Sequence, residues 1–70
     1  MATNHFVIVA KDGRFWTGSR WAWEYPNAHV YRALKYALEI VQCMEVPCAI
    51  HNNYGMDEER VVEEHQVVTQ

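Results

Sequence analysis

The sequence contains few of the residue types that mark several classes of protein. It holds 3 glycines, 2 prolines and 2 cysteines in 70 residues, so neither a flexible low-complexity chain nor a disulfide scaffold is indicated. The apolar stretches are all short, which argues against a membrane-spanning helix. Residues 1–10 also lack the basic flank and long apolar run of a signal peptide. We therefore expect a protein of the reducing cytoplasm, without a membrane partner.

Charge is unevenly distributed along the chain. Residues 1–42 carry five basic and three acidic side chains, whereas residues 43–70 carry Arg60 against six acidic ones. The formal net charge is −3. Because attraction to phosphates supplies most of the affinity of general nucleic-acid binders, this balance argues against such a function. The acidic run near the end lacks a calcium-loop pattern and is typical of a solvated face or tail.

Half of the residues are hydrophobic (50%), which is a globular composition. A chain of this length buries only about 60% of its unfolded surface, so its core is thin. We expect one domain over residues 1–70. Its ordered core should span about residues 5–51, and residues 56–70 should form either an extra strand or an acidic tail.

Residues 5–25 have the pattern of a β-hairpin. The apolar stretch 6–9 is rich in β-branched residues, and Asp12-Gly13 is the strongest short signal for a two-residue type I′ turn. Such a turn would place Ala10 opposite Phe15 and Val9 opposite Trp16.

That register assigns the hairpin side chains to two faces. Phe6, Ile8, Ala10 and Phe15 would form the core face. The other face would carry a mixture of apolar and basic side chains, which is the pattern of an interface. Its predicted members are Val7, Val9, Trp16, Lys11 and Arg14.

Residues 28–44 have helical periodicity, with one apolar stripe that includes Leu34, Ala37 and Val41. Asn27 is a candidate N-cap, although residues 28–32 could form a separate turn. Residues 46–51 read as a third strand. The fold class is therefore α+β, a small β-β-α-β(-β) domain in which one amphipathic helix covers one face of an antiparallel hairpin sheet. The other face has no second layer to cover it.

The hairpin with Asp12-Gly13-Arg14-Phe15-Trp16, followed by the Trp-rich segment 21–28, an amphipathic helix and a short strand, resembles a group of small uncharacterised bacterial and phage-borne proteins. The resemblance covers roughly residues 6–50. It implies no known activity, and no functional residue is transferred by it.

Cys43, Cys48 and His51 have a C-x4-C-x2-H spacing, and His65 could supply a fourth zinc ligand. The spacing differs from that of zinc knuckles, and free cysteines are usually buried as small apolar residues. We therefore expect packing residues, with no metal and no cofactor. No nucleophile, phosphate-loop or zincin motif occurs, so we expect no catalytic residue and no enzyme.

The composition of the outer face supports two functions. The first is a small interaction module that self-associates as a homodimer, or that binds another protein, because Trp and Arg dominate protein interfaces. The second is weak binding of single-stranded nucleic acid through Trp16, Lys11, Arg14 and Arg20, since aromatic side chains flanked by cations stack bases. We expect the homodimer, because pairing two open faces would also thicken a marginal core.

Overall fold

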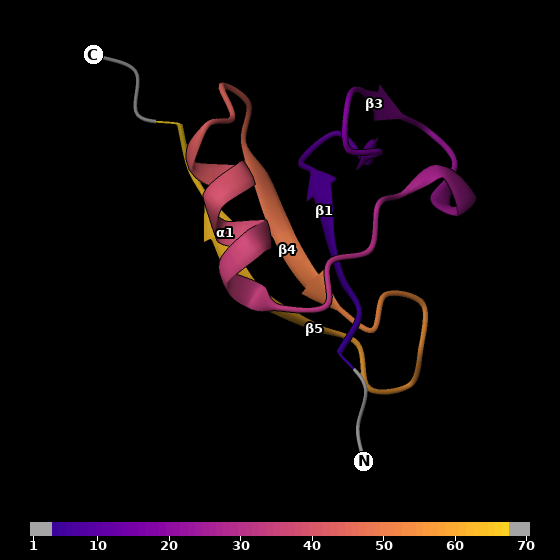
Figure 1. Cartoon of the computed structure of the whole chain (residues 1–70). Helices are drawn as coiled ribbons and strands as arrows, with labels where there is room; N and C mark the ends of the chain where they lie inside the picture. The colour runs from indigo at the N-terminus through magenta and orange to yellow at the C-terminus, as the bar shows by residue number, and fades with distance from the viewer. Residues whose placement is uncertain (1–3, 68–70) are drawn as a thin grey trace.

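A computed structural model describes residues 4–67 and shows a small α+β fold with one antiparallel sheet and one α-helix (Figure 1). The elements in chain order are β1 (Phe6–Ala10), β2 (Phe15–Trp16), β3 (Trp21–Ala22), a 3-10 turn η1 (Tyr25–Asn27), α1 (Leu34–Gln42), β4 (Cys48–Asn52) and β5 (Arg60–His65). The sheet order is β3-β2-β1-β4-β5. The predicted fold class is confirmed, and the last segment forms a strand.

The β1–β2 turn differs from the predicted type I′ turn. The Gly13 N–H donates to the Ala10 carbonyl (2.9 Å), and the Ala10 N–H donates to the Arg14 carbonyl (2.7 Å). Gly13 has φ +101°, whereas Asp12 is not among the residues with positive φ. These features describe a three-residue loop, in which a type I turn is followed by a left-handed glycine. The predicted two-residue turn is therefore wrong by one residue.

This difference reverses the faces of the return strand. Val9 lies opposite Phe15, so Phe15 points to the same side as Val9, and Trp16 points to the other side. A shift of one residue moves every side chain of a strand to the opposite face, because side chains alternate with a period of two. Phe15 is buried, as predicted, but on the opposite face of the sheet from Phe6 and Ile8, and the predicted outer position of Trp16 is wrong.

The α-helix is shorter than predicted, because it begins at Leu34 after Ala33. Tyr31 instead exchanges two backbone hydrogen bonds with Phe6 (2.8 and 2.9 Å), and the His29 N–H donates to the Trp16 carbonyl (2.8 Å). The strand β2 is only two residues long and leaves backbone groups of β1 unpaired. Satisfying those groups outweighs the helical periodicity of the preceding residues. Asn27 is correspondingly the last residue of η1 and not a helix N-cap.

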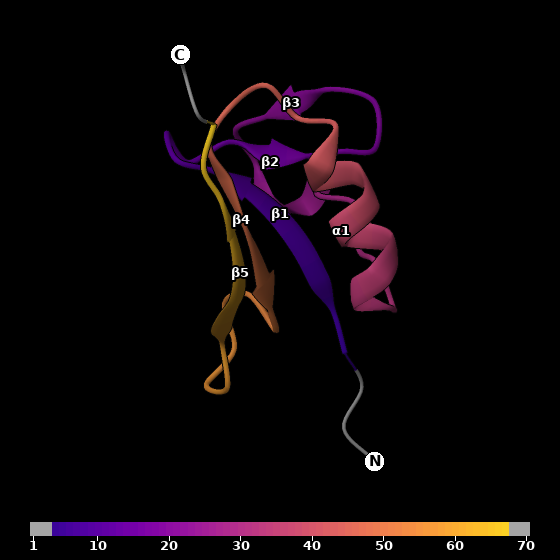
Figure 2. The same ribbon diagram turned by 90° about the vertical axis from the view of Figure 1, so that its left-hand side faces the viewer.

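The helix packs on one face of the sheet (Figure 2). Ile8 and Ile50 are fully buried at the centre of this face, and Ala37 and Val41 of α1 cover them. The predicted apolar stripe is therefore confirmed within α1, where Leu34 also packs against the same cluster. Trp16 and Trp21 extend the cluster at the short-strand end of the sheet.

The strand β4 starts at Cys48, slightly later than predicted, and pairs with β1 and with β5. The pairing of β4 with β5 shifts between Ile50 and His51, which indicates a β-bulge. This bulge lets Val62 pack against the helix-covered cluster while Val61 lies opposite His51. Within residues 4–67, no helix is long and apolar enough to cross a bilayer.

Candidate functional site: a concave sheet face and a tryptophan–arginine surface

The face of the sheet opposite the helix is partly covered by an aromatic cluster, which we define as Phe15, Tyr25 and Tyr54. Phe15 makes edge contacts with both tyrosine rings (centroid distances 5.6 and 5.1 Å), and the tyrosines stack on each other at 5.0 Å. Phe15 is only 5% exposed, and Val7, which faces the same side, is fully buried. The expectation that nothing covers this face is therefore wrong for the end that carries the aromatic cluster.

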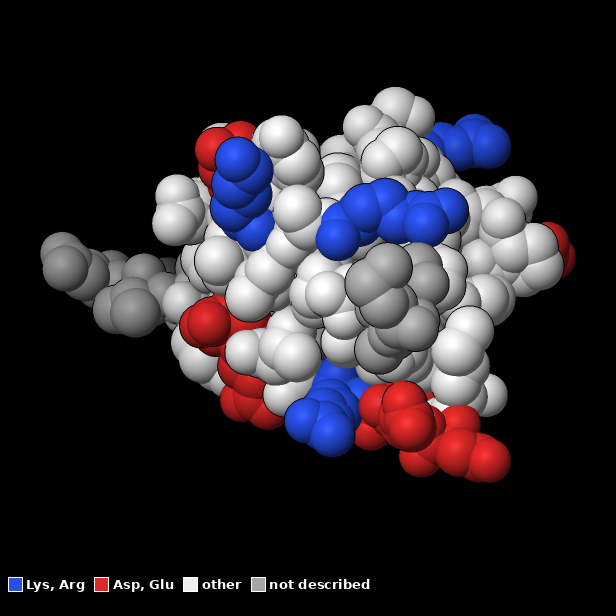
Figure 3. Space-filling model, turned by 60° about the horizontal axis from the view of Figure 1, so that its bottom comes forward, with Lys and Arg blue, Asp and Glu red and all other residues white. Residues whose placement is uncertain are grey.

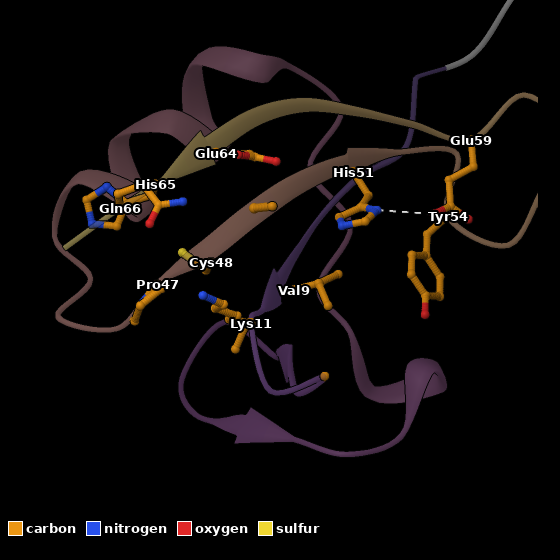
Figure 4. A pocket seen from close by; sticks show the side chains of 13 residues that line it. Val9, Lys11, Pro47, Cys48, His51, Tyr54, Glu59, Glu64, His65 and Gln66 are labelled. Atoms are coloured by element: carbon orange, nitrogen blue, oxygen red, sulfur yellow. Dashed lines mark hydrogen bonds and ion pairs between the residues drawn. The ribbon is translucent and has the colours of Figure 1, made fainter.

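Beside the aromatic cluster, the same face forms an open concavity of about 590 Å³ (Figure 4). Its floor includes Val9, Ala49 and Glu64, which lie in one row across β1, β4 and β5. Because the Ala49 side chain in the middle of the row is small, it leaves space above the sheet, and this space gives the hollow its depth. Lys11 and Glu64 approach it from either side of β4, and His51 and Tyr54 form a further wall.

His51 is held in one orientation by the loop before β5. Its Nδ1 lies 3.1 Å from Oε2 of Glu59, and the other oxygen of this carboxylate accepts a hydrogen bond from the Gly55 N–H (2.7 Å). These two interactions, the Gly55 bond first, lower the pKa of Glu59 below its ordinary value. An ionised carboxylate only accepts hydrogen bonds, so Nδ1 carries the proton. In the neutral form of His51, Nε2 would then be an acceptor, on the ring edge that faces away from Glu59.

The second candidate surface surrounds the β1–β2 turn. The Nε of Arg14 donates to Oδ2 of Asp12 (2.8 Å), and this bond is the main reason that the pKa of Asp12 is lowered. The Arg14 guanidinium carbon lies 5.7 Å from the Trp21 ring centre and 5.9 Å from that of Trp23. Trp23 is 68% exposed. We call Arg14, Trp21 and Trp23 the tryptophan–arginine surface.

The five residues predicted as an interface do not share one surface. Val7 is buried beneath the outer face, and Trp16 packs on the opposite, helix-covered face. Val9 and Lys11 line the concavity, whereas Arg14 belongs to the tryptophan–arginine surface. The predicted interface residues divide in this way because the extra residue in the β1–β2 turn reverses the faces of the β2 side chains and leaves those of β1 unchanged.

Trp16 and Trp23 lie in different environments. Trp16 was expected outside, but it is half-buried and contacts Trp21 edge to face at 5.3 Å. Trp23 is the most exposed of the large hydrophobic residues described. The exposed aromatic beside the basic turn is thus Trp23.

The residues of the nucleic-acid alternative are similarly dispersed. Arg20 is exposed at the end of the turn that joins β2 to β3, where its backbone carbonyl accepts a hydrogen bond from the Thr17 N–H (2.9 Å). On the face shown in Figure 3, Lys and Arg side chains lie in separate groups, and acidic side chains occur at several places around the edge, most densely at the lower right. A continuous basic groove does not cross this face.

The residues with zinc-like spacing are separated by the fold. Cys48 is buried on the helix side of β4, whereas His51, three positions along the strand, faces the concavity. Cys43 is exposed at the end of α1, and the predicted burial of this thiol is wrong. The Nε2 of His65 interacts with the Met44 carbonyl (3.1 Å). Within residues 4–67, no three metal-ligating side chains gather in one place.

Sequence reasoning missed Tyr54, Glu59 and the role of Tyr25. All three lie in connections, where no periodicity assigns a side chain to a face. The available signal was an aromatic residue inside the turn 52–55, since an aromatic ring at a loop position often packs on a neighbouring surface. Asn53, with φ +58°, shapes this turn and directs the Tyr54 ring back over the sheet.

In comparisons with known proteins, the chain matches no family model, no curated protein and no solved structure. The resemblance inferred from its motifs therefore stays a prediction, and its function has to be argued from the two surfaces described above.

Proposed function

We propose that the protein is a small non-enzymatic interaction module that self-associates, and that its principal contact is the tryptophan–arginine surface. The observation that carries this proposal is Trp23, which is 68% exposed beside an arginine already held by Asp12. When a small domain leaves a large apolar side chain in water, a partner that buries this side chain can stabilise the complex. Full burial of such a side chain is worth about 2–3 kcal/mol.

The composition and rigidity of this surface support a role in binding. Trp and Arg are the residue types most enriched among residues that dominate binding energy. Arg14 interacts with Asp12 and lies near two indole rings, so it loses little side-chain freedom when a partner arrives. Its Nε is engaged, which leaves the terminal guanidinium nitrogens to meet an acceptor on the partner.

A second copy of the chain offers a complementary surface. The strand β5 lies at the opposite edge of the sheet from β3, and its acidic side chain Glu63, which does not line the concavity, is exposed. In a symmetric dimer, the acidic edge of each copy would meet the tryptophan–arginine surface of the other. Exposed ion pairs contribute little, so the indole contact should supply most of the affinity.

The proposal includes no catalytic step and places the protein in the cytoplasm. Among residues 4–67, both side-chain hydrogen bonds of histidines go to oxygen acceptors, namely Glu59 and the Met44 carbonyl, and neither involves a hydroxyl or thiol nucleophile. Cys43 and Cys48 are free thiols, which fits a reducing compartment.

Single-stranded nucleic acid is the second candidate partner. The same exposed indole favours it, because bases stack on tryptophan and nearby cations attract phosphates. Arg14 lies beside Trp23, and Lys11 is exposed in the same turn. The net charge of −3 and the separate basic groups in Figure 3 favour the protein partner over this one.

Sedimentation equilibrium over micromolar concentrations tests the two candidates. We expect a monomer–dimer equilibrium for the wild type and a dimer weakened at least tenfold in Trp23→Ala. The matched control is Tyr36→Ala, because Tyr36 is also an exposed aromatic (52%) beside a cation, Lys35, but lies on α1. This control should self-associate like the wild type.

Three other outcomes would contradict the proposal of self-association through the tryptophan–arginine surface. If the wild type is a monomer that binds an oligothymidine with affinity falling steeply as salt rises, and Trp23→Ala abolishes this binding, nucleic acid is the partner. If the wild type is a monomer without affinity for the oligonucleotide at low salt, both candidates fail. If Tyr36→Ala weakens the dimer as much as Trp23→Ala, the contact has been assigned to the wrong surface.

A further inference from the structure

The concavity on the outer sheet face has features of a small-molecule site that the proposed self-association does not use. Its volume of about 590 Å³ lies within the usual range for ligand pockets. It combines a small apolar floor, Val9 and Ala49, with a few polar groups around the rim. This combination is typical of sites that bind compact organic molecules.

The walls at one end are already fixed. The Tyr54 ring is stacked on Tyr25 at 5.0 Å, meets Phe15 edge to face at 5.1 Å, and lies 5.5 Å from the His51 ring. His51 is itself oriented by Glu59 (3.1 Å). A ligand would therefore meet an aromatic wall and an oriented imidazole without having to order them, which lowers the cost of binding.

Two opposite charges lie on either side of the hollow without pairing. Glu64 is on β5, and Lys11 follows β1 two positions after Val9, on the same face. Strands are about 4.8 Å apart, so β1 and β5 are separated by roughly 10 Å across β4. Among residues 4–67, neither side chain takes part in an ion pair within 4.0 Å. The rim thus presents a carboxylate and an ammonium group that face the same space (Figure 4).

We propose that this concavity binds a free α-amino acid with an apolar or aromatic side chain. The ammonium group of the ligand would meet the Glu64 carboxylate, and its carboxylate would meet the Lys11 ammonium. Its side chain would lie over Ala49 toward Tyr54 and His51. A ligand of one charge only would leave one of the two rim charges unmatched, whereas a zwitterion satisfies both.

The histidine gives this site a further polar contact. With the proton on Nδ1, the Nε2 of His51 can accept a hydrogen bond from the ammonium group of the ligand. The site would then offer the cationic end two acceptors, Glu64 and His51, and the anionic end one donor, Lys11. The loss of either charged end of the ligand should weaken binding.

Titration of ¹⁵N-labelled protein followed by amide chemical shifts tests this proposal. The probes are L-phenylalanine, L-leucine and L-methionine. A compact ligand of this size in an open site should bind with a dissociation constant of about 1 mM. Saturable shifts should appear at the amides of Ala49, His51 and Tyr54 for at least one probe. N-acetyl-L-phenylalanine and L-phenylalanine amide, which lack the ammonium and the carboxylate respectively, should bind at least fivefold more weakly than L-phenylalanine.

Variants separate charge recognition from unspecific contact. Glu64→Gln and Lys11→Met should each weaken binding at least fivefold. Glu63→Gln is the matched control, because Glu63 is the adjacent exposed carboxylate of β5 and does not line the concavity, and this variant should bind like the wild type. The spectrum of each variant without ligand reports whether the fold is retained.

The ligand titrations and the variants each have a result that would overturn the proposal. The concavity is not an amino-acid site if no probe produces saturable shifts at concentrations up to about ten times the expected dissociation constant. It is only an apolar hollow if the blocked compounds bind as well as the free amino acid, or if Glu63→Gln has the same effect as Glu64→Gln. Because these experiments do not depend on Trp23, a negative result would leave the self-association proposal unaffected.

Discussion

The two faces of the sheet are covered in different ways. One face is covered by α1, whose residues Ala37 and Val41 pack on the fully buried Ile8 and Ile50. The other face is covered only at one end, by aromatic side chains from a strand, a 3-10 turn and a loop. The rest of that face is the concavity. A continuous helix seals its face, whereas separate loop residues leave room for a binding site.

This difference also separates stability from recognition. The helix-covered face is apolar, with Ile8 and Ile50 at its centre and Trp16 and Trp21 at one end. The outer face contains His51, Glu59, Lys11 and Glu64, which are oriented by loops or exposed at the rim. Binding residues are commonly carried by loops on a rigid scaffold, and the sheet is that scaffold in this protein.

The largest expected effect comes from the helix-covered face. Ile50 is fully buried beneath α1, so Ile50→Ala should lower the free energy of unfolding by about 2–5 kcal/mol through lost burial and a residual cavity. Urea denaturation followed by circular dichroism measures the loss. A variant with the midpoint of the wild type would show that the helix does not seal this face.

A smaller loss should come from the aromatic cluster. Tyr54 packs on Phe15 and Tyr25 but remains partly exposed, so Tyr54→Ala should cost about 1–3 kcal/mol. Tyr36→Ala on the solvent side of α1 should leave the denaturation midpoint nearly unchanged and serves as the control. Equal midpoints for the two variants would mean that the outer face gains no stability from its loop residues.

The β1–β2 turn, which determines the side of the sheet to which each β2 side chain points, should be destabilised by a single added methyl group. Gly13 has φ +101°, a conformation that other residues resist, so Gly13→Ala should destabilise the protein by about 1–2 kcal/mol. The nearest side-chain atom to the new methyl group would be 4.0 Å away in Trp23, so backbone strain and not collision is the cause. An unchanged thermal midpoint would contradict the left-handed glycine.

The smallest expected effect concerns the outer face and pH. Because the pKa of folded Glu59 lies below its ordinary value of 4.5, its contribution to stability is complete above that pH. The contribution is lost as pH falls through the lowered pKa. Wild type and Glu59→Gln should therefore differ most near neutral pH and converge in acid below 4.5. Parallel curves with a constant offset would contradict this linkage. Glu58→Gln, one residue earlier, is the control.

The sequence was most informative where one periodicity decided the outcome. The alternation of β1 correctly assigned Phe6 and Ile8 to the helix-covered core, and the apolar stripe correctly assigned Ala37 and Val41 to the same core. The resulting α+β class is confirmed. The helix start was less predictable, because His29 and Tyr31 form backbone hydrogen bonds with β2 and β1, which local sequence does not reveal.

The candidate site was predicted only in part. Val9 and Lys11 line the concavity and Arg14 contributes to the exposed surface, as their positions on the hairpin suggested. Trp16 and Val7 were misassigned for two different reasons. Trp16 follows a turn whose length was wrong by one residue, and Val7 is buried on a face partly covered by aromatic residues that come from loops.

By itself, the sequence determined β1, most of α1 and β4 and their order, because strand and helix periodicities are properties of neighbouring residues. It did not reveal β3, and it left β5 open as either a strand or a tail. The tertiary structure decided which side of the sheet each tryptophan occupies, since one extra residue in the turn reverses the return strand. It also decided that His51, Glu59 and Tyr54 meet over the outer face, where a loop folds back on strands from both ends of the chain. These contacts depend on how segments that are distant in the sequence pack together, and no local sequence pattern encodes that packing.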